Sequence, residues 1–162
     1  MKSLLVLGAG TFAPQIEEIA QEEGYKKIAF LDDNPDAAYC EPVIGKMDDV
    51  GKFVEEFECA IVALGNNHDR MKYTLELERL GFKIPYLIHP TAYVSKDAKI
   101  GHGCIIREKA IISRYAELEK AVIINAGAII DHHCVISEGT HCLIGSVVRN
   151  KVRVPPMSWI EI

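Results

Sequence analysis

Residues 121–148 read AVIINAGAIIDHHCVISEGTHCLIGSVV, and the same pattern returns in them every six residues. The repeat continues without insertion from Ala92 to the C-terminus. Every sixth residue from Val94 onward is aliphatic in eleven of twelve cases: Val94, Ile100, Ile106, Ile112, Leu118, Ile124, Ile130, Ile136, Cys142, Val148, Val154 and Ile160. A parallel series of mostly small residues starts two positions earlier: Ala92, Ala98, Cys104, Ala110, Ala116, Val122, Ala128, Cys134, Thr140, Ser146, Val152 and Ser158. Because a helix repeats near 3.6 residues and a half-buried strand near 2, a period of six predicts short strands joined by fixed turns.

This period is typical of a hexapeptide-repeat β-helix. Each repeat places one bulky aliphatic side chain in the interior and one small residue where the wall turns. A single repeat cannot bury its apolar side chain alone, so stacked coils must cover each other and pair each other's backbone groups. We therefore expect residues 89–162 to form about four coils.

Composition and charge narrow the class of protein. The chain has 162 residues, a formal net charge of −5 and a pI near 5.7, which argues against a nucleic-acid or anionic membrane surface as the main partner. The apolar run from Leu4 to Leu7 is too short for a signal peptide or a membrane span. We expect a cytoplasmic protein. Its odd number of cysteines, three of them in the inward columns of the repeat, favours reduced thiols over disulfides.

The first ninety residues follow a different pattern. Continuous apolar runs alternate with helical patterns, which predicts a parallel sheet covered on both faces. The expected strands are residues 3–7, 27–31 and 60–64, and the expected helices are residues 14–23 and about 69–80. We interpret residues 1–88 as a small Rossmann-like domain and place the boundary to the repeats directly after it.

Three loops follow the carboxyl ends of these strands, where such a sheet binds ligands. Gly8 and Gly10 would let backbone amides approach a phosphate, although a glycine turn can also be purely structural. Asp32 and Asp33 could accept hydrogen bonds from a ribose or a base, or belong to a solvated turn. The segment Gly65-Asn66-Asn67 could be a further ligand loop, or a turn and helix cap.

The order of five motifs resembles the bacterial sugar O/N-acyltransferases. The motifs are Leu5-Val6-Leu7-Gly8-Ala9-Gly10, Phe30-Leu31-Asp32-Asp33, Ala63-Leu64-Gly65-Asn66-Asn67, Ile88-His89-Pro90 and Ile130-Asp131-His132-His133-Cys134. The resemblance includes UDP-amino-sugar N-acetyltransferases of the bacillosamine type and relatives of sialic acid O-acetyltransferases. It implies a homotrimer of left-handed β-helices, with acetyl-CoA as co-substrate between neighbouring coils. It also implies that the N-terminal domain holds a sugar nucleotide, for which a UDP-amino sugar is the expectation.

The resemblance further implies roles for single residues. His132 matches the family's catalytic histidine, the base that takes a proton from the acceptor amine or hydroxyl. We count the adjacent His133 as a second catalytic candidate, although it has no counterpart in the family pattern. His141 matches a histidine that contacts acetyl-CoA. The expected sugar-nucleotide contacts are Gly8, Gly10, Thr11, Phe12, Asp32, Asp33, Gly65, Asn66, Asn67 and, near the reaction centre, Asn125.

The repeat register tests part of this assignment. If Ile130 and Cys134 point inward, His132 lies on the outer wall, available to solvent or to a second subunit. The alternative is that His132 is only a wall residue stacked between Arg114 and Asn150, its neighbours when a coil takes eighteen residues. A zinc site is not expected, because inward cysteines cannot share a metal with outward histidines.

The chain departs from the family pattern in three places. His133 stands where many relatives carry an acidic residue, Phe12 replaces a histidine of the glycine turn, and the repeats stop after twelve hexads. An alternative function is therefore a catalytically weak sugar-nucleotide-binding trimer that lacks donor-binding coils. A nicotinamide-dependent oxidoreductase built on the glycine turn would leave the repeats unexplained.

Overall fold

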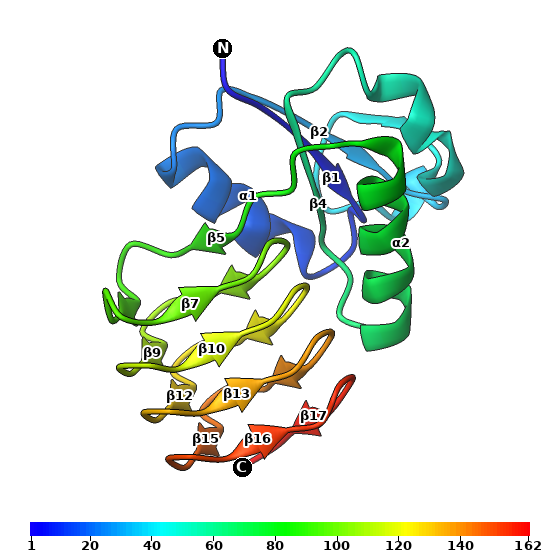
Figure 1. Ribbon diagram of the computed structural model, residues 1–162. Helices are drawn as coiled ribbons and strands as arrows, with labels where there is room; N and C mark the ends of the chain where they lie inside the picture. The colour runs from blue at the N-terminus through cyan, green and yellow to red at the C-terminus, as the bar shows by residue number, and fades with distance from the viewer. The chain divides into compact units, whose positions relative to one another are not determined.

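The computed structural model describes residues 1–162, which fold as two units, Met1–Pro85 and Tyr86–Ile162 (Figure 1). The division falls three residues before the boundary at 88 expected from the sequence. The reason is that Leu87–Ile88 forms strand β5, which pairs in parallel with Ile105–Ile106 of the repeats. The short apolar run before Pro90 therefore begins the β-helix rather than closing the first domain.

The first unit is built on a parallel sheet of four strands in the order β3-β2-β1-β4. The bounds are β1 Ser3–Leu7, β2 Lys27–Leu31, β3 Val43–Gly45 and β4 Cys59–Val62. All residues of β1 and β4 are buried, which explains why these strands read as continuous apolar runs. The expected Rossmann-like parallel α/β arrangement is confirmed.

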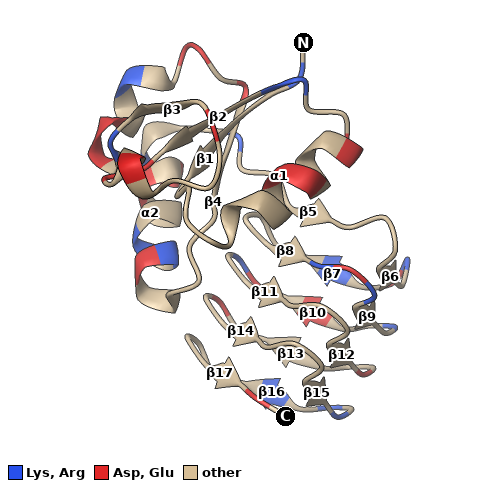
Figure 2. Ribbon diagram, turned by 180° about the vertical axis from the view of Figure 1, so that it is seen from behind, with Lys and Arg blue, Asp and Glu red and all other residues tan.

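Two helices and two short 3-10 turns connect the strands. They are α1 Ala13–Glu22, η1 Pro35–Ala37, η2 Met47–Phe53 and α2 Asn67–Leu80. Leu77 of α2 packs in one core cluster with Leu5 and Leu7 of β1. The buried side chains of α1 lie outside that cluster, and Figures 1 and 2 show α1 and α2 on opposite sides of the sheet. The sheet is therefore covered on both faces.

The second unit contains three parallel sheets of two-residue strands, the arrangement typical of a left-handed β-helix. The first sheet has β6 Tyr93–Val94, β9 Ile111–Ile112, β12 Ile129–Ile130 and β15 Val147–Val148. The second has β7 Lys99–Ile100, β10 Glu117–Leu118, β13 Val135–Ile136 and β16 Arg153–Val154. The third has β5, β8 Ile105–Ile106, β11 Ile123–Ile124, β14 His141–Cys142 and β17 Trp159–Ile160. Successive coils stack in register, so that Ile123 pairs with Ile105 of one neighbouring coil and with His141 of the other.

The interior of the β-helix consists of the two residue columns that the period defines. Ile106, Ile124 and Ile130 are fully buried in one cluster with Cys134 and Cys142. Burial raises the pKa of the Cys134 thiol, and it raises the pKa of Cys142 to about 12. Both cysteines are therefore neutral thiols inside the core, as their place in the repeat predicts.

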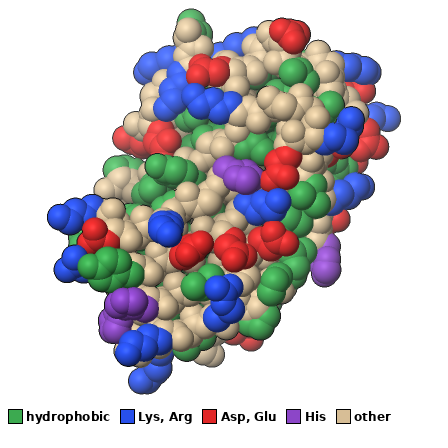
Figure 3. Space-filling model, in the orientation of Figure 1, with side chains coloured by type: hydrophobic (Ala, Val, Ile, Leu, Met, Phe, Trp, Pro, Cys, Tyr) green, Lys and Arg blue, Asp and Glu red, His purple; other side chains and the backbone are tan.

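The three outer faces of the β-helix differ in chemistry. The first residue of each strand points outward, and in the β7, β10, β13 and β16 sheet these residues are Lys99, Glu117, Val135 and Arg153. Figure 2 shows this charge on β7, β10 and β16, and Figure 3 shows side chains of both signs over the same face. In the sheet of β6, β9, β12 and β15 the corresponding residues are all apolar: Tyr93, Ile111, Ile129 and Val147. We call these four residues the apolar stripe.

Neither α1 nor α2 has the length and hydrophobicity of a membrane-spanning helix.

Candidate functional site

The glycine turn after β1 is held by the protein's own hydrogen bonds. Gly8 has φ +104°, and a Cβ there would lie 2.7 Å from the Leu64 side chain, so this position needs glycine for packing. The Gly8 N–H donates to the Leu31 carbonyl at 2.8 Å. The Ala9 N–H donates to Asp32 Oδ2 at 2.8 Å. The chain then passes Gly10 and Thr11 to Phe12, the N-cap of α1, so the glycine turn leads directly into the N-terminus of the helix.

The two aspartates after β2 organise the loops around them. Asp32 accepts from Ala9 N through one oxygen and from Asn34 N, at 2.8 Å, through the other. Asp33 Oδ1 accepts from Met47 N at 3.0 Å. Asp32 therefore fastens the glycine turn to the second strand, while Asp33 keeps its second oxygen for other partners.

The loop after β4 is positioned by a buried arginine that the sequence did not reveal. Arg70 of α2 is completely buried and donates to the carbonyls of Leu64 at 3.1 Å and Gly65 at 3.2 Å. It also donates to Asn67 Oδ1 at 2.8 Å. Asn66 caps α2, because its side chain accepts from Asp69 N at 3.0 Å. The helix thus starts at Asn67, slightly before the expected start, and both asparagines have structural bonds.

A pocket of about 320 Å³ opens beside these loops. Its lining combines carboxylates with one amine and one phenol, and consists of Asp32, Asp33, Met47, Leu64, Asp69, Lys72 and Tyr73. Burial, followed by the charges of Asp48 and Asp33, raises the pKa of Tyr73. Carboxylates suit the hydroxyls of a ribose and the N–H groups of a base, and an ammonium suits a phosphate.

Sequence reasoning missed the side of this pocket that α2 contributes. Asp69, Lys72 and Tyr73 stand at positions i, i+3 and i+4 of the helix, so they share one face. Their position in the first turns of the helix that follows the Gly65-Asn66-Asn67 loop was the sequence feature that could have indicated these three residues. Charged and aromatic residues on a helix usually form its solvent-exposed face, so the sequence alone did not identify these residues as candidate ligand contacts.

The two predicted catalytic histidines lie together on the turn between β12 and β13. Their Nδ1 atoms are 2.9 Å apart, so one of the two atoms carries a hydrogen and the other accepts the hydrogen bond. His133 adopts φ +59°, and its ring lies 5.0 Å from that of Tyr115 in the preceding coil. Asn150 of the next coil places its amide nitrogen 3.3 Å from His132 Nε2, as the register predicts. Figure 3 shows histidine side chains exposed at this edge of the repeats.

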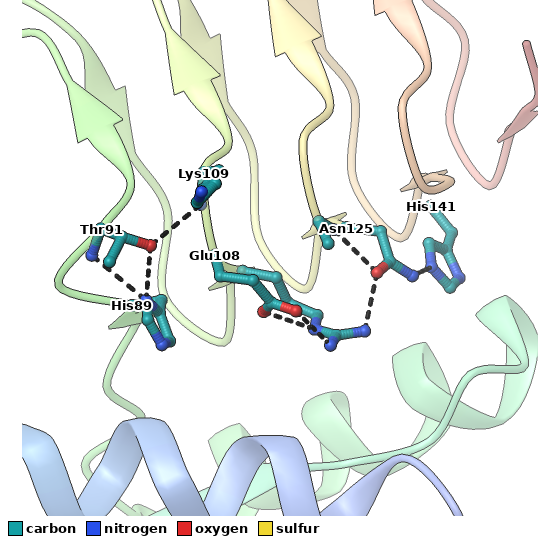
Figure 4. A network of polar contacts seen from close by, with 8 residues as sticks. His89, Thr91, Glu108, Lys109, Asn125 and His141 are labelled. Atoms are coloured by element: carbon teal, nitrogen blue, oxygen red, sulfur yellow. Dashed lines mark hydrogen bonds and ion pairs between the residues drawn. The ribbon is translucent and has the colours of Figure 1, made fainter.

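The remaining predicted residues of the β-helix, Asn125 and His141, form a second polar cluster on a different turn. Asn125 Nδ2 lies 3.1 Å from His141 Nε2, and both side chains are buried. Arg107 donates to Asn125 Oδ1 at 2.8 Å and forms an ion pair with Glu108 (Figure 4). His141 packs edge-on to Trp159, with ring centroids 4.7 Å apart.

A cavity of about 460 Å³ adjoins this second cluster. Its lining is mostly apolar and consists of Asn125, Leu143, Ile144, Glu161 and Ile162. Ile144 is largely exposed, so the cavity offers apolar surface to a ligand that enters from solvent. The combination of an apolar wall with a few fixed polar groups is the usual chemistry of a small-molecule site.

The structure does not bring the two clusters of the β-helix together within one chain. His132 and His133 lie on the turn after β12, whereas Asn125 lies on the turn before it. The strands that bear the apolar stripe run between these two turns. A site that uses both clusters would need a second copy of the chain on that face.

Comparisons with known proteins agree with this architecture. Residues 3–77 match the family model described as the PglD N-terminal domain. The chain is 35% identical to the acetyltransferase domain of PglB from Neisseria gonorrhoeae FA1090, solved in complex with acetyl coenzyme A. The match has a TM-score of 0.92 and covers 98% of this chain and 78% of that one.

Two more distant structures share the fold. PerB from Caulobacter crescentus, solved with CoA and GDP-perosamine, is 22% identical, with a TM-score of 0.80 and coverage of 96% of this chain and 92% of its own. WeeI from Acinetobacter baumannii AYE is 15% identical, with a TM-score of 0.66 and coverage of 95% and 94%. At these identities the likeness concerns the fold alone.

Proposed function

Because this chain belongs to the family of the PglB acetyltransferase domain, we propose that it transfers an acetyl group from acetyl-CoA to an amino or hydroxyl group of a nucleotide-linked sugar. The observation that carries the proposal is the likeness over almost the whole chain to an acetyltransferase domain bound to acetyl coenzyme A. The histidine pair and the two ligand-sized cavities add support, since they provide a base and places for two substrates.

His132 is the general base of the proposed reaction. With Asn150 Nδ2 donating to Nε2, the His132 proton sits on Nδ1 and is donated to Nδ1 of His133. When the acceptor nitrogen or oxygen replaces the Asn150 amide at Nε2 and attacks the thioester carbonyl, Nε2 takes its proton. The tetrahedral intermediate then collapses with cleavage of its C–S bond, the CoA thiolate takes the proton that Nε2 received, and the acetyl group remains on the sugar. His133 replaces the more common carboxylate as the group that orients the base.

The sugar nucleotide would bind at the carboxyl edge of the first sheet. The pocket beside Asp33, Asp69 and Lys72 offers acceptors for ribose or base and one cation for phosphate. Gly10, Thr11 and Phe12 bring the N-terminus of α1 to the same edge. Asp32, Asn66 and Asn67 shape this site through the hydrogen bonds that fix its loops. We propose a UDP-amino sugar as the first ligand to test.

Acetyl-CoA would bind along the turns that carry Asn125 and Leu143. The cavity there is apolar enough for the pantetheine arm, and His141 lies behind Asn125 as a fixed polar group. No metal ion is needed for this chemistry, because the thioester is already reactive toward an amine once a base removes the proton.

The functional assembly in this proposal is a homotrimer. Tyr93 and Val147 of the apolar stripe are more than half exposed, and Ile111 is 39% exposed, so one face of the β-helix presents a continuous apolar surface. Packing this face against a second copy would cover it. The same packing would bring the His132 turn of one copy toward the Asn125 turn of its neighbour, because the stripe lies between the two turns.

A charge in the stripe is expected to dissociate the trimer. Ile111→Glu would bury an unpaired carboxylate in the interface, which costs several kcal/mol per site, so the variant should elute as a monomer. Val135→Glu is the matched control, since Val135 also points outward from a strand but lies on the charged face. Light scattering after size exclusion gives the masses. A monomeric wild type, or dissociation by Val135→Glu alone, would contradict the proposed interface.

The proposed function is tested by binding and turnover on the wild-type protein. Calorimetry with acetyl-CoA and with a panel of UDP-amino sugars should give saturable binding of both substrates. Incubation of the pair should release free CoA thiol and yield an acetylated sugar. Its mass shows the added acetyl group, and its stability to mild base distinguishes an amide from an ester.

Three outcomes would redirect the interpretation. Sugar-nucleotide binding without acetyl-CoA binding would support the alternative, a sugar-nucleotide-binding trimer with little or no catalysis. NADH binding without either substrate would favour an oxidoreductase instead. Release of CoA without acetylated sugar would mean hydrolysis, and the acceptor class would then have to be revised.

A further inference from the structure

The Asn125 side chain has its amide orientation fixed by two donors. Its Oδ1 accepts from Arg107 Nη1 at 2.8 Å and from the backbone N–H of Ala126 at 2.8 Å (Figure 4). Turning the amide over would place its NH₂ group against both donors. The oxygen is therefore held toward Arg107, and the NH₂ group is held toward His141.

This orientation determines which nitrogen of His141 carries the proton. Asn125 Nδ2 is a donor and lies 3.1 Å from His141 Nε2, so Nε2 has to be the acceptor. The proton of the neutral ring then resides on Nδ1. A ring with hydrogen on Nε2 would face the NH₂ group donor to donor, and His141 is too buried, at 5% exposure, for water to separate them.

Arg107 is itself held in place. Its Nε and Nη2 atoms donate to the two oxygens of Glu108 at 3.2 and 2.7 Å, which leaves Nη1 directed at Asn125. The side chain is only 14% exposed. A forked guanidinium can engage a carboxylate and an amide oxygen at once, whereas an ammonium group cannot reproduce both contacts with the same geometry.

We propose that Arg107 is a positioning residue, which fixes the Asn125 amide and thereby keeps His141 as a neutral ring with hydrogen on Nδ1. His141 is then a hydrogen-bond donor and not a second base, which separates its role from that of His132. Asn125 lines the cavity and His141 does not, so the fixed Asn125 amide is the link between His141 and the proposed acetyl-CoA site. The assignment of the tautomer stands on the geometry alone, and only its link to acetyl-CoA rests on the proposed function.

The tautomer can be measured directly by long-range ¹H–¹⁵N correlation spectra of the ¹⁵N-histidine-labelled protein without any ligand. The wild type should show His141 with hydrogen on Nδ1. Arg107→Met leaves only the Ala126 N–H to hold the Asn125 oxygen, so the tautomer with hydrogen on Nε2 should gain population. Asn125→Asp keeps Arg107 in place but presents a carboxylate to the ring, so hydrogen should move to Nε2. Arg153→Met, which removes an exposed arginine from the charged face, should leave the spectrum as in the wild type.

The second part of the test is acetyl-CoA affinity. Arg107→Met is expected to bind acetyl-CoA about tenfold more weakly, the effect of losing one well-placed hydrogen bond. Hydrogen on Nε2 in the wild type, or hydrogen retained on Nδ1 in both variants, would overturn the proposal. A changed tautomer with unchanged affinity would overturn its link to the donor site. If the tautomers follow expectation and the wild type binds no acetyl-CoA, the positioning role stands and the proposed function fails.

Discussion

His132→Ala is expected to lower kcat by roughly 10²- to 10⁴-fold while KM for acetyl-CoA changes little. In the proposed mechanism the imidazole takes the acceptor proton as the thioester is attacked, and alanine would leave that proton to bulk water. Binding should persist, because the proposed substrate contacts lie on other turns and in the first unit. Steady-state release of the CoA thiol at saturating sugar nucleotide measures the loss.

His68→Ala is the matched control for this substitution. His68 is exposed on α2 and belongs to neither histidine cluster, so its removal should leave kcat unchanged. His133→Ala should lower kcat less than His132→Ala does, because in the proposed mechanism His133 only orients the base and does not take the proton. His132→Ala activity within a few fold of the wild type would show that His132 is a wall residue between coils, the alternative that the repeat register leaves open.

Arg70→Met is expected to reduce the free energy of unfolding by about 3–5 kcal/mol, because three acceptors lose their donor and each buried group left without one costs about 1–3 kcal/mol. Methionine fills a similar volume but donates no hydrogen bond. The carbonyls of Leu64 and Gly65 and the Asn67 side chain would lose their donor inside the protein. Urea unfolding followed by circular dichroism gives the change.

Arg79→Met provides the comparison on the same helix. Its guanidinium is 68% exposed and pairs with Glu76 at the surface. The effect should therefore stay within about 0.5 kcal/mol. The loss in the free energy of unfolding for Arg70→Lys should lie between those of Arg70→Met and Arg79→Met, because an ammonium group cannot reach all three acceptors. Equal stability of the Arg70→Met and Arg79→Met proteins would mean that the buried Arg70 guanidinium does not stabilise the loop after β4.

The β-helix could be predicted from the sequence almost strand by strand. Its regularity is local, because each coil repeats the same inward and outward alternation. Ile106, Ile124 and Cys142 enter the core at the spacing that the period requires. The division between the two units differs by three residues from the expected one. Nothing in the sequence of Leu87 and Ile88 indicates that they pair with Ile105–Ile106 of the repeats.

The candidate site could be predicted only in part. The loops with Gly8, Asp32 and Gly65 are recognisable because strands must end in turns at the binding edge of a parallel sheet. Their hydrogen bonds were not predictable, since Asp32 reaches back to Ala9 and Arg70 reaches back to Leu64 through the tertiary structure. A charged residue in a helix is usually solvated, so nothing in the sequence distinguishes Arg70 from Arg79.

Periodicity and adjacency are properties of the chain, so the amino-acid sequence was enough to establish the parallel sheet domain, the β-helix and the place of His132 beside His133 on one turn. The folded structure was needed to establish that Arg107 orients Asn125 toward His141 and that α2 lines a pocket with Lys72 and Tyr73. It was also needed to separate the two polar clusters onto different turns. These arrangements depend on distances between residues of different coils and elements. Such distances arise from packing in three dimensions, which no pattern along the chain encodes.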